Sequence, residues 1–150
     1  MTKMRRRVFA AGSAAFAFAP YIANAQKKYD PGVTDKEIKL GHTNPYSGPL
    51  SAYGTIGKAI EAYWKMVNDN GGINGRRINF ITYDDGFVPP KTVEMVRKLV
   101  EDDKVFAIFQ LLGTPTNTVV QKYLNQKKVP QLFVATGGAS RLAATCTKTL

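Results

Sequence analysis

The chain has 150 residues, of which 44% are hydrophobic and 21% are charged, a composition that is typical of one folded domain and excludes collagen-like and intrinsically disordered chains. The formal net charge is +10, which raises the question of nucleic-acid binding. The single cysteine, Cys146, excludes an internal disulfide framework and a thiolate zinc site, because both need several sulfur atoms.

The first 25 residues have the three-part layout of a secretory signal peptide. Four basic residues stand within the first seven positions, an alanine-rich apolar stretch covers residues 8–19, and Ala23-Asn24-Ala25 is a small-residue cleavage sequence. We therefore expect cleavage after Ala25 and a periplasmic location. Arg6-Arg7 fits a twin-arginine signal, and an ordinary Sec signal fits as well, so both export routes remain open. Gln26, where a lipoprotein would have cysteine, predicts no lipid anchor.

Part of the positive charge belongs to this leader. Cleavage would remove four of the 21 basic residues and none of the 11 acidic ones, which leaves 17 against 11, or +6. Later basic pairs such as Arg76-Arg77 and Lys127-Lys128 lack the interleaved aromatic residues of a strand-binding groove. We expect no nucleic-acid partner and a mild electrostatic preference for small anionic molecules.

The rest of the chain alternates β-rich runs with helical patterns. The patterns predict strands at residues 37–42, 78–83, 105–109 and 131–134, and helices over about 52–70, from 90 onward and from 114 onward. Apolar residues at helical spacing should form the buried faces of these helices: Ile56, Ala59, Ile60, Tyr63 and Val67 in the first, Val93, Val96, Leu99 and Val100 in the second, and Val119, Val120, Tyr123 and Leu124 in the third. Trp64, beside the first stripe, is also expected to pack in the core.

This alternation predicts an α/β fold with right-handed crossovers, in which helices cover both faces of a parallel sheet. Ligands of such sheets bind outside the carboxyl ends of the strands. Function is therefore expected in four loops, at residues 43–51, 84–89, 110–116 and 135–140.

The sequence contains no complete motif for catalysis, metal binding or phosphate binding. The Gly-Lys pair at Lys58 lacks both the spacing and the following hydroxyl of a phosphate-binding loop. Asp84 and Asp85 are expected to cap the adjoining loop and helix or to border a cleft, and His42 to be a packed or cleft-edge side chain. We expect no metal, no cofactor, no catalytic residue and hence no enzyme activity.

The loop before the third helix has the best physical case for a site. Gly113 permits close backbone approach, Thr114 offers a hydroxyl, and the helix N-terminus favours an anion such as a carboxylate. Thr114 followed by Pro115 also fits a simple N-cap of that helix, and the two interpretations remain open at this point.

Five segments carry a family resemblance. They are Pro45-Tyr46-Ser47-Gly48-Pro49, Tyr53-Gly54, Val67-Asn68-Asp69-Asn70-Gly71-Gly72-Ile73-Asn74-Gly75, Tyr83-Asp84-Asp85 and Val129-Pro130. Together they resemble the branched-chain amino acid-binding family, the exported substrate-binding proteins of ABC importers with the type I periplasmic-binding fold. The resemblance implies a two-lobed clamp that closes on a small ligand and presents it to a membrane permease.

The resemblance also implies roles for individual residues. Tyr53 would wall the ligand side chain, Gly113 and Thr114 would grip its carboxylate, Ala135 and Thr136 would take the ammonium and carboxylate groups, and Tyr46 and Ser47 would lie at the cleft edge. The implied ligand bears a carboxylate and is a hydrophobic amino acid or an aromatic or aliphatic acid. A ligand-sensing module of a receptor or regulator is the alternative.

The sequence departs from the family pattern at several points. Gly113 stands where familiar amino-acid binders have serine, and Phe87 and Leu112 stand where they have a cysteine pair, which suggests apolar packing in its place. The acidic residue that holds an amino acid's ammonium comes from the second lobe in this family. We expect residues 26–150 to be a partial N-terminal lobe of a longer chain.

Overall fold

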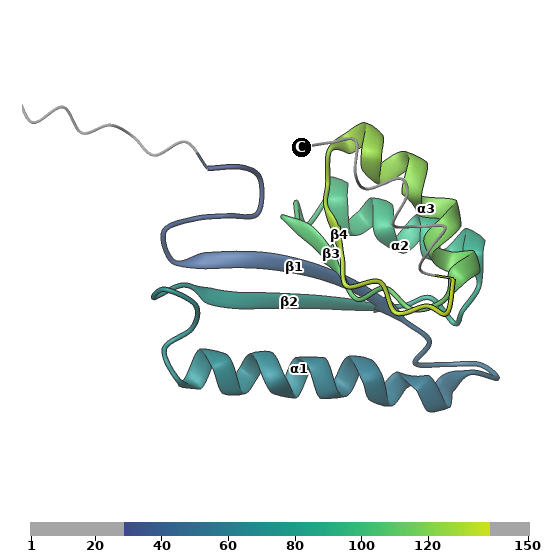
Figure 1. Cartoon of the computed structure of the whole chain (residues 1–150), viewed down its shortest axis with the longest axis horizontal. Helices are drawn as coiled ribbons and strands as arrows, with labels where there is room; N and C mark the ends of the chain where they lie inside the picture. Colours follow the sequence, from purple (N-terminus) through teal and green to yellow (C-terminus); the bar gives the residue numbers. More distant parts are fainter. Residues whose placement is uncertain (1–28, 139–150) are drawn as a thin grey trace, which may run out of the picture.

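The computed structural model describes residues 29–138 (Figure 1). The predicted signal peptide and Cys146 lie outside these residues. The elements run in the order β1 (Glu37–Asn44), η1 (Ser51–Tyr53), α1 (Gly54–Asp69), β2 (Arg77–Asp84), α2 (Pro89–Glu101), β3 (Ala107–Phe109), α3 (Thr114–Lys127) and β4 (Gln131–Leu132). Every strand and helix predicted from the sequence is present in the predicted order, although β3 and β4 are shorter than predicted.

The four strands form one parallel sheet in the order β2-β1-β3-β4. Helix α1 covers one face of the sheet, and α2 and α3 cover the other (Figure 1). The predicted fold class, a parallel sheet with helices on both faces, is confirmed. The chain leaves β1 toward one face and leaves β3 toward the other, so a topological switch point lies between these neighbouring strands, where such sheets form their ligand crevices.

The core has two parts, one on each face of the sheet. Between the sheet and α2 and α3, the side chains of Val96, Leu99, Ile108, Val120 and Leu124 are fully or almost fully buried. This confirms the predicted inward face of α2 and most of that of α3, where Tyr123 is partly buried and packs against the same cluster. Val119, also predicted inward, is 44% exposed, because α3 turns Val120 and Leu124 toward α2 instead.

On the other face, the predicted buried stripe of α1 is partly wrong. Tyr63 is 53% exposed and Ala59 is exposed as well. The buried residues of α1 are Gly54 and Gly57, with Trp64 packed against the inner cluster around Leu40. Because glycine has no side chain, Gly54 and Gly57 allow Tyr46 of the loop after β1 to approach the helix closely, and part of the apolar stripe of α1 faces outward.

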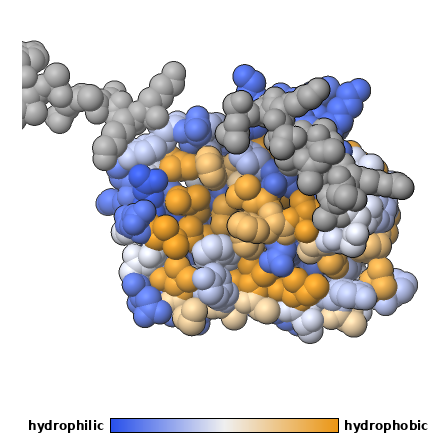
Figure 2. Space-filling view, in the orientation of Figure 1, coloured by the Kyte–Doolittle hydropathy of each residue, from blue (hydrophilic) through white to orange (hydrophobic). Residues whose placement is uncertain are grey.

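Several large apolar side chains are exposed on the surface of the described residues. Tyr63 and Met66 on α1 and Phe133 after β4 are 53%, 52% and 75% exposed. On the face shown in Figure 2, hydrophobic residues gather over the strands and along α1. Within residues 29–138, no helix combines the length and apolar character needed to cross a membrane.

Candidate functional site

A cavity of about 350 Å³ lies at the carboxyl ends of the strands, where the topology predicts a site. Loops that follow all four strands contribute to it. Its lining residues are Leu50, Tyr53, Phe87, Leu112, Gly113, Thr114, Pro115, Ala135, Thr136 and Gly137. The cavity thus brings together five of the seven residues that the sequence selected: Tyr53, Gly113, Thr114, Ala135 and Thr136.

The polar part of this cavity is a pair of threonine hydroxyls. The side-chain oxygens of Thr114 and Thr136 are hydrogen-bonded to each other, and Thr136 Oγ1 also accepts a hydrogen bond from the amide of Gly138 at 3.1 Å. The backbone holds the two segments together, since the amide of Gly113 donates to the carbonyl of Ala135 at 2.9 Å. The loops after β3 and β4 therefore continue the sheet pairing up to the cavity.

The N-terminus of α3 also borders the cavity. Gly113, with φ 95° and ψ 145°, is the N-cap, and no side chain caps the helix. The predicted N-cap role of Thr114 is therefore wrong: Thr114 is the first helical residue, and its hydroxyl turns to Thr136. By helix geometry the amides of Thr114 and Thr116 have no acceptor within the helix, and Pro115 has no amide hydrogen. This end of α3 offers hydrogen-bond donors and the positive end of the helix dipole.

Gly113 is packed against the ring of Phe87. A Cβ atom at position 113 would lie 2.3 Å from Phe87 Cε2 and 2.6 Å from its Cζ, far inside van der Waals contact. Phe87 itself has φ 61°, and its amide donates to Asp85 Oδ1 at 2.9 Å. The serine of familiar amino-acid binders could not occupy position 113 with Phe87 in this place.

Tyr46 and Ser47 do not line the cavity. Tyr46 extends beneath α1, where its hydroxyl lies 2.7 Å from Thr82 Oγ1, and burial raises the pKa of this phenol. Ser47 donates its hydroxyl to Asp84 Oδ2 at 2.5 Å. The contacts of both residues connect the loop after β1 to β2.

Asp84 accepts most of the hydrogen bonds that connect the loop after β1 to the end of β2. Its carboxylate accepts hydrogen bonds from the amides of Tyr46 at 2.9 Å and Gly86 at 3.0 Å, and it forms an ion pair with Lys91 at 3.1 Å. Burial acts to raise the pKa of Asp84, but the hydrogen bonds from Ser47, Lys91 and the two amides outweigh it and lower the pKa below its ordinary value.

The neighbouring carboxylate of Asp85 is buried. It accepts hydrogen bonds from the hydroxyls of Thr43 at 3.0 Å and Thr92 at 2.9 Å, in addition to the amide of Phe87. The prediction that the two aspartates cap the adjoining loop is confirmed, since they accept the amides of Gly86 and Phe87. The predicted cap of the following helix is wrong, because the N-cap of α2 is Val88 and no side chain caps this helix. Within residues 29–138, no group of three or more His, Cys, Asp or Glu side chains could hold a metal ion.

His42 is a packed residue of the sheet, as one of the two sequence interpretations proposed. Its ring is fully buried, Nδ1 donates to the carbonyl of Phe109 at 2.8 Å, and the ring lies 5.4 Å from that of Phe80. Burial lowers its pKa more than this hydrogen bond and the charge of Asp85 raise it. The histidine is therefore neutral and structural at pH 7.

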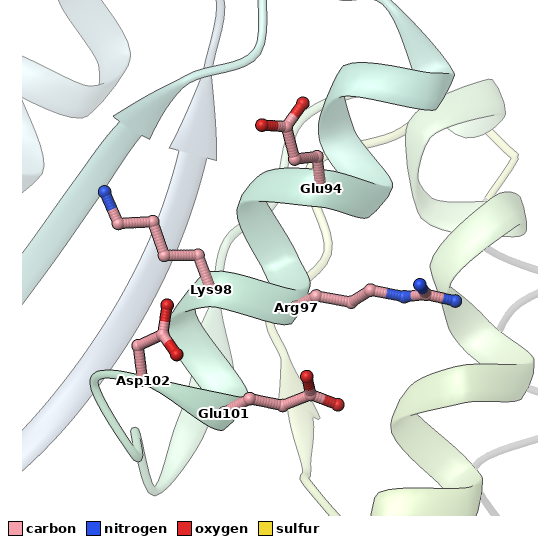
Figure 3. Close-up of a pocket in the computed structure, with 5 residues that line it drawn as sticks. All are labelled: Glu94, Arg97, Lys98, Glu101 and Asp102. Carbon is pink, nitrogen blue, oxygen red and sulfur yellow. The ribbon is translucent and has the colours of Figure 1, made fainter.

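A second hollow, of about 280 Å³, lies along α2 and is lined by Glu94, Arg97, Lys98, Glu101 and Asp102. Figure 3 shows that these side chains diverge: Arg97 and Glu101 extend toward α3, and Lys98 extends to the opposite side. Several already have partners, since Glu101 pairs with Lys127 at 3.1 Å and Lys98 lies 4.5 Å from the ring centre of Tyr83. The hollow is a charged helix surface without convergent groups.

Five lining residues of the first cavity were not selected from the sequence: Leu50, Phe87, Leu112, Pro115 and Gly137. All of them fall inside the four loops that the strand pattern marked for function. The sequence feature that could have identified these five residues is therefore their position in the loops after the strands. Their residue types do not indicate a binding role, because glycine and apolar side chains carry no charge and no hydrogen-bonding group.

Comparisons with known proteins agree with this geometry. The sequence model of the family described as periplasmic binding protein matches residues 37–149. A leucine-, isoleucine-, valine-, threonine- and alanine-binding protein of Pseudomonas aeruginosa is 28% identical over 124 residues, which cover 81% of this chain and 30% of that protein.

Two solved structures extend the comparison. A fatty acid ABC transporter substrate-binding protein from Thermomonospora curvata has a TM-score of 0.61 and 32% identity, covering 73% of this chain and 27% of the other. A branched-chain amino acid transporter substrate-binding protein from Streptococcus pneumoniae, solved with isoleucine, has a TM-score of 0.63 and 25% identity, covering 74% and 32%. The chain spans about a third of the length of these relatives. The matched residues and the fold together show that the chain belongs to the periplasmic binding protein family, with the fold of the N-terminal portion of a branched-chain amino acid-binding protein.

Proposed function

We propose that this chain supplies one wall of the ligand site in an exported solute-binding protein of an ABC importer, and that the ligand is a small molecule bearing a carboxylate. The main support is the composition of the cavity: two hydrogen-bonded threonine hydroxyls and a helix N-terminus stand at one end, and apolar side chains form the walls.

The polar end suits a carboxylate for two physical reasons. A carboxylate accepts hydrogen bonds from hydroxyls and free amides, and charge assistance strengthens such bonds. The N-terminal end of α3 adds a favourable dipole. Without ligand, one of the two threonine hydroxyls donates its proton to the other. When a ligand binds, both hydroxyls can rotate and donate their protons to the carboxylate oxygens.

The apolar walls suit the body of the ligand. Leu50, Tyr53, Phe87 and Leu112 present aliphatic or aromatic surface to the cavity. The relatives named above bind amino acids or, by name, transport fatty acids, and these molecules share a carboxylate while their bodies differ. We therefore propose a hydrophobic amino acid or an aromatic or aliphatic acid as the ligand.

The rest of the ligand site would come from outside this chain segment. The cavity as described is open, and a small ligand is held tightly only when most of its surface is buried. We propose that a second lobe closes over the cavity and supplies any acidic partner for an ammonium group, and that the closed form docks on a membrane permease. The proposed location is the periplasm, after cleavage of the leader.

Isothermal titration calorimetry on the intact protein isolated from its host tests this proposal. The probes are L-leucine, benzoate and octanoate, with L-leucinamide as the matched ligand that lacks the carboxylate. We expect stoichiometric binding of at least one of the three acids and none of the amide. If none of the acids binds, or if leucinamide binds as tightly as leucine, the carboxylate proposal is wrong.

A further inference from the structure

We infer that Phe87 is the specificity-determining residue of this cavity: its ring takes the space of a side chain at position 113 and selects carboxylates with a flat aromatic body. The inference rests on the proposed function and deepens it. It starts from the contact between the Phe87 ring and Gly113, and from the place of both residues in the cavity lining.

The local backbone holds the ring in position. Phe87 has φ 61°, a left-handed conformation that is uncommon for a bulky residue and is retained only where surrounding contacts impose it. Gly86 before it has φ 57°, and the buried carboxylate of Asp85 accepts the Phe87 amide. Asp85 is itself fixed by two threonine hydroxyls. The chain therefore turns sharply after β2 and delivers an aromatic ring to the N-terminus of α3.

The Phe87 ring limits which groups at the N-terminus of α3 can bind a carboxylate. Because position 113 cannot carry a side chain, the carboxylate would be held by the Thr114 and Thr136 hydroxyls and by helix amides alone. The space beside this polar end is walled by Phe87 and, from the loop after β1, by Tyr53. Two aromatic walls favour a planar ring in offset or edge-to-face contact more than an aliphatic body of similar size.

The ligand arm of the test compares benzoate with cyclohexanecarboxylate on the intact protein. Both carry one carboxylate on a six-membered ring and no ammonium, so the pair isolates flatness and aromaticity. We expect the wild-type protein to prefer benzoate by about threefold to tenfold, as one aromatic contact implies. Phe87→Leu should abolish this preference. The control is Phe133→Leu, another phenylalanine at positive φ, which is exposed and outside the cavity lining and should keep the preference.

The stability arm needs no ligand. Gly113→Ala, Phe87→Ala and the double variant form a double-mutant cycle in urea unfolding. Gly113→Ala is strained by the positive φ of this position in either background, but with Phe87 present the added Cβ atom also collides with the ring. We expect the loss in the folding equilibrium constant to be at least about threefold smaller without Phe87.

The outcomes separate the two proposals. If the wild-type protein binds neither benzoate, cyclohexanecarboxylate, L-leucine nor octanoate, both the proposed function and this inference are wrong. Binding without a preference for benzoate, or a preference that survives in Phe87→Leu, overturns the inference alone. Equal costs of Gly113→Ala in the two backgrounds would also overturn it, because the ring would then not occupy the space at position 113.

Discussion

The side-chain hydroxyls of Thr114 and Thr136 are hydrogen-bonded to each other, although they follow different strands and stand 22 positions apart in the chain. The backbone pairing of Leu112 and Gly113 with Ala135 brings them together. Both hydroxyls line the cavity beside the first turn of α3. Removal of one hydroxyl should therefore affect ligand binding more than folding.

Thr114→Val tests this pair directly. We expect the affinity for carboxylate ligands to fall more than tenfold, or by at least about 1.4 kcal/mol, because a charge-assisted hydrogen bond is lost. Thr118→Val is the matched control, since Thr118 lies one turn later on α3, is exposed and donates only to the carbonyl of Thr114. Calorimetric titration of both variants provides the measurement. Unchanged affinity in Thr114→Val would remove this residue from the site.

Gly57 should be intolerant of substitution for a structural reason. A Cβ atom there would lie 2.0 Å from the hydroxyl oxygen of Tyr46 and 2.8 Å from its ring. An exposed helical glycine normally gains stability of about 1 kcal/mol on replacement by alanine. We expect Gly57→Ala instead to destabilise the protein by about 1–3 kcal/mol, through displacement of Tyr46.

Urea unfolding measures this change. Lys58→Ala, at the exposed neighbouring position on the same helix, is the control and should change stability by no more than about 0.5 kcal/mol. If Gly57→Ala stabilises the protein, Tyr46 does not pack beneath α1 as described.

The sequence predicted the fold well because the strand and helix patterns are regular and every loop between them is short. It predicted the inner face of α1 less well. An apolar stripe through Ala59 and Tyr63 favours one rotation of the helix, but the close approach of Tyr46 to Gly54 and Gly57 selects another. Hydropathy gives glycine no weight as a packing surface, so this rotation could not be read from the pattern.

His42 should make stability depend on pH in a defined range. It is the single histidine of the chain, and burial lowers its pKa in the folded state below the ordinary value of 6.5. The unfolded chain therefore binds a proton before the folded one does as the pH falls. Stability should be full above about pH 7 and fall between pH 6.5 and the lowered native pKa, by up to about 1.4 kcal/mol at pH 5.5.

Urea unfolding at pH 7.5 and 5.5 checks this expectation. His42→Gln should be less stable at pH 7.5, because it loses the packed imidazole, but it should show little change between the two pH values. A wild-type protein whose stability is the same at both values would contradict the burial of a neutral histidine.

Asp84 should make the stability of the protein depend on pH at lower pH values than His42 does. Its folded-state pKa is below the ordinary carboxyl value of 3.8, so its stabilising effect is present above about pH 4 and is lost as the pH falls toward the lowered pKa. Asp84→Asn should destabilise the protein at pH 7 by about 1–3 kcal/mol, since hydrogen bonds to a charged acceptor are weakened. The difference from wild type should shrink below pH 4.

Denaturant unfolding at pH 7 and pH 3.5 measures both effects. Asp69→Asn, an exposed carboxylate at the end of α1, serves as the control and should change stability little at either pH. A stability difference for Asp84→Asn that is the same at both pH values would mean that its charge does not hold the loop after β1.

The sequence predicted the position of the cavity and half of its lining residues, but it did not predict the role of Phe87. The parallel topology placed it at the carboxyl ends of the strands, and the family resemblance selected Tyr53, Gly113, Thr114, Ala135 and Thr136. The role of Phe87 depends on a left-handed backbone and on a contact between two loops, and neither leaves a trace in hydropathy or residue spacing. Such details follow from tertiary packing.

A crystal structure of the intact protein with bound benzoate or L-leucine would show directly which groups hold the ligand's carboxylate. We expect the carboxylate to lie within about 2.7–3.2 Å of the hydroxyl oxygens of Thr114 and Thr136, with the ligand body against Tyr53. A ligand that binds elsewhere and leaves the two threonines bonded only to each other would contradict their role in carboxylate binding.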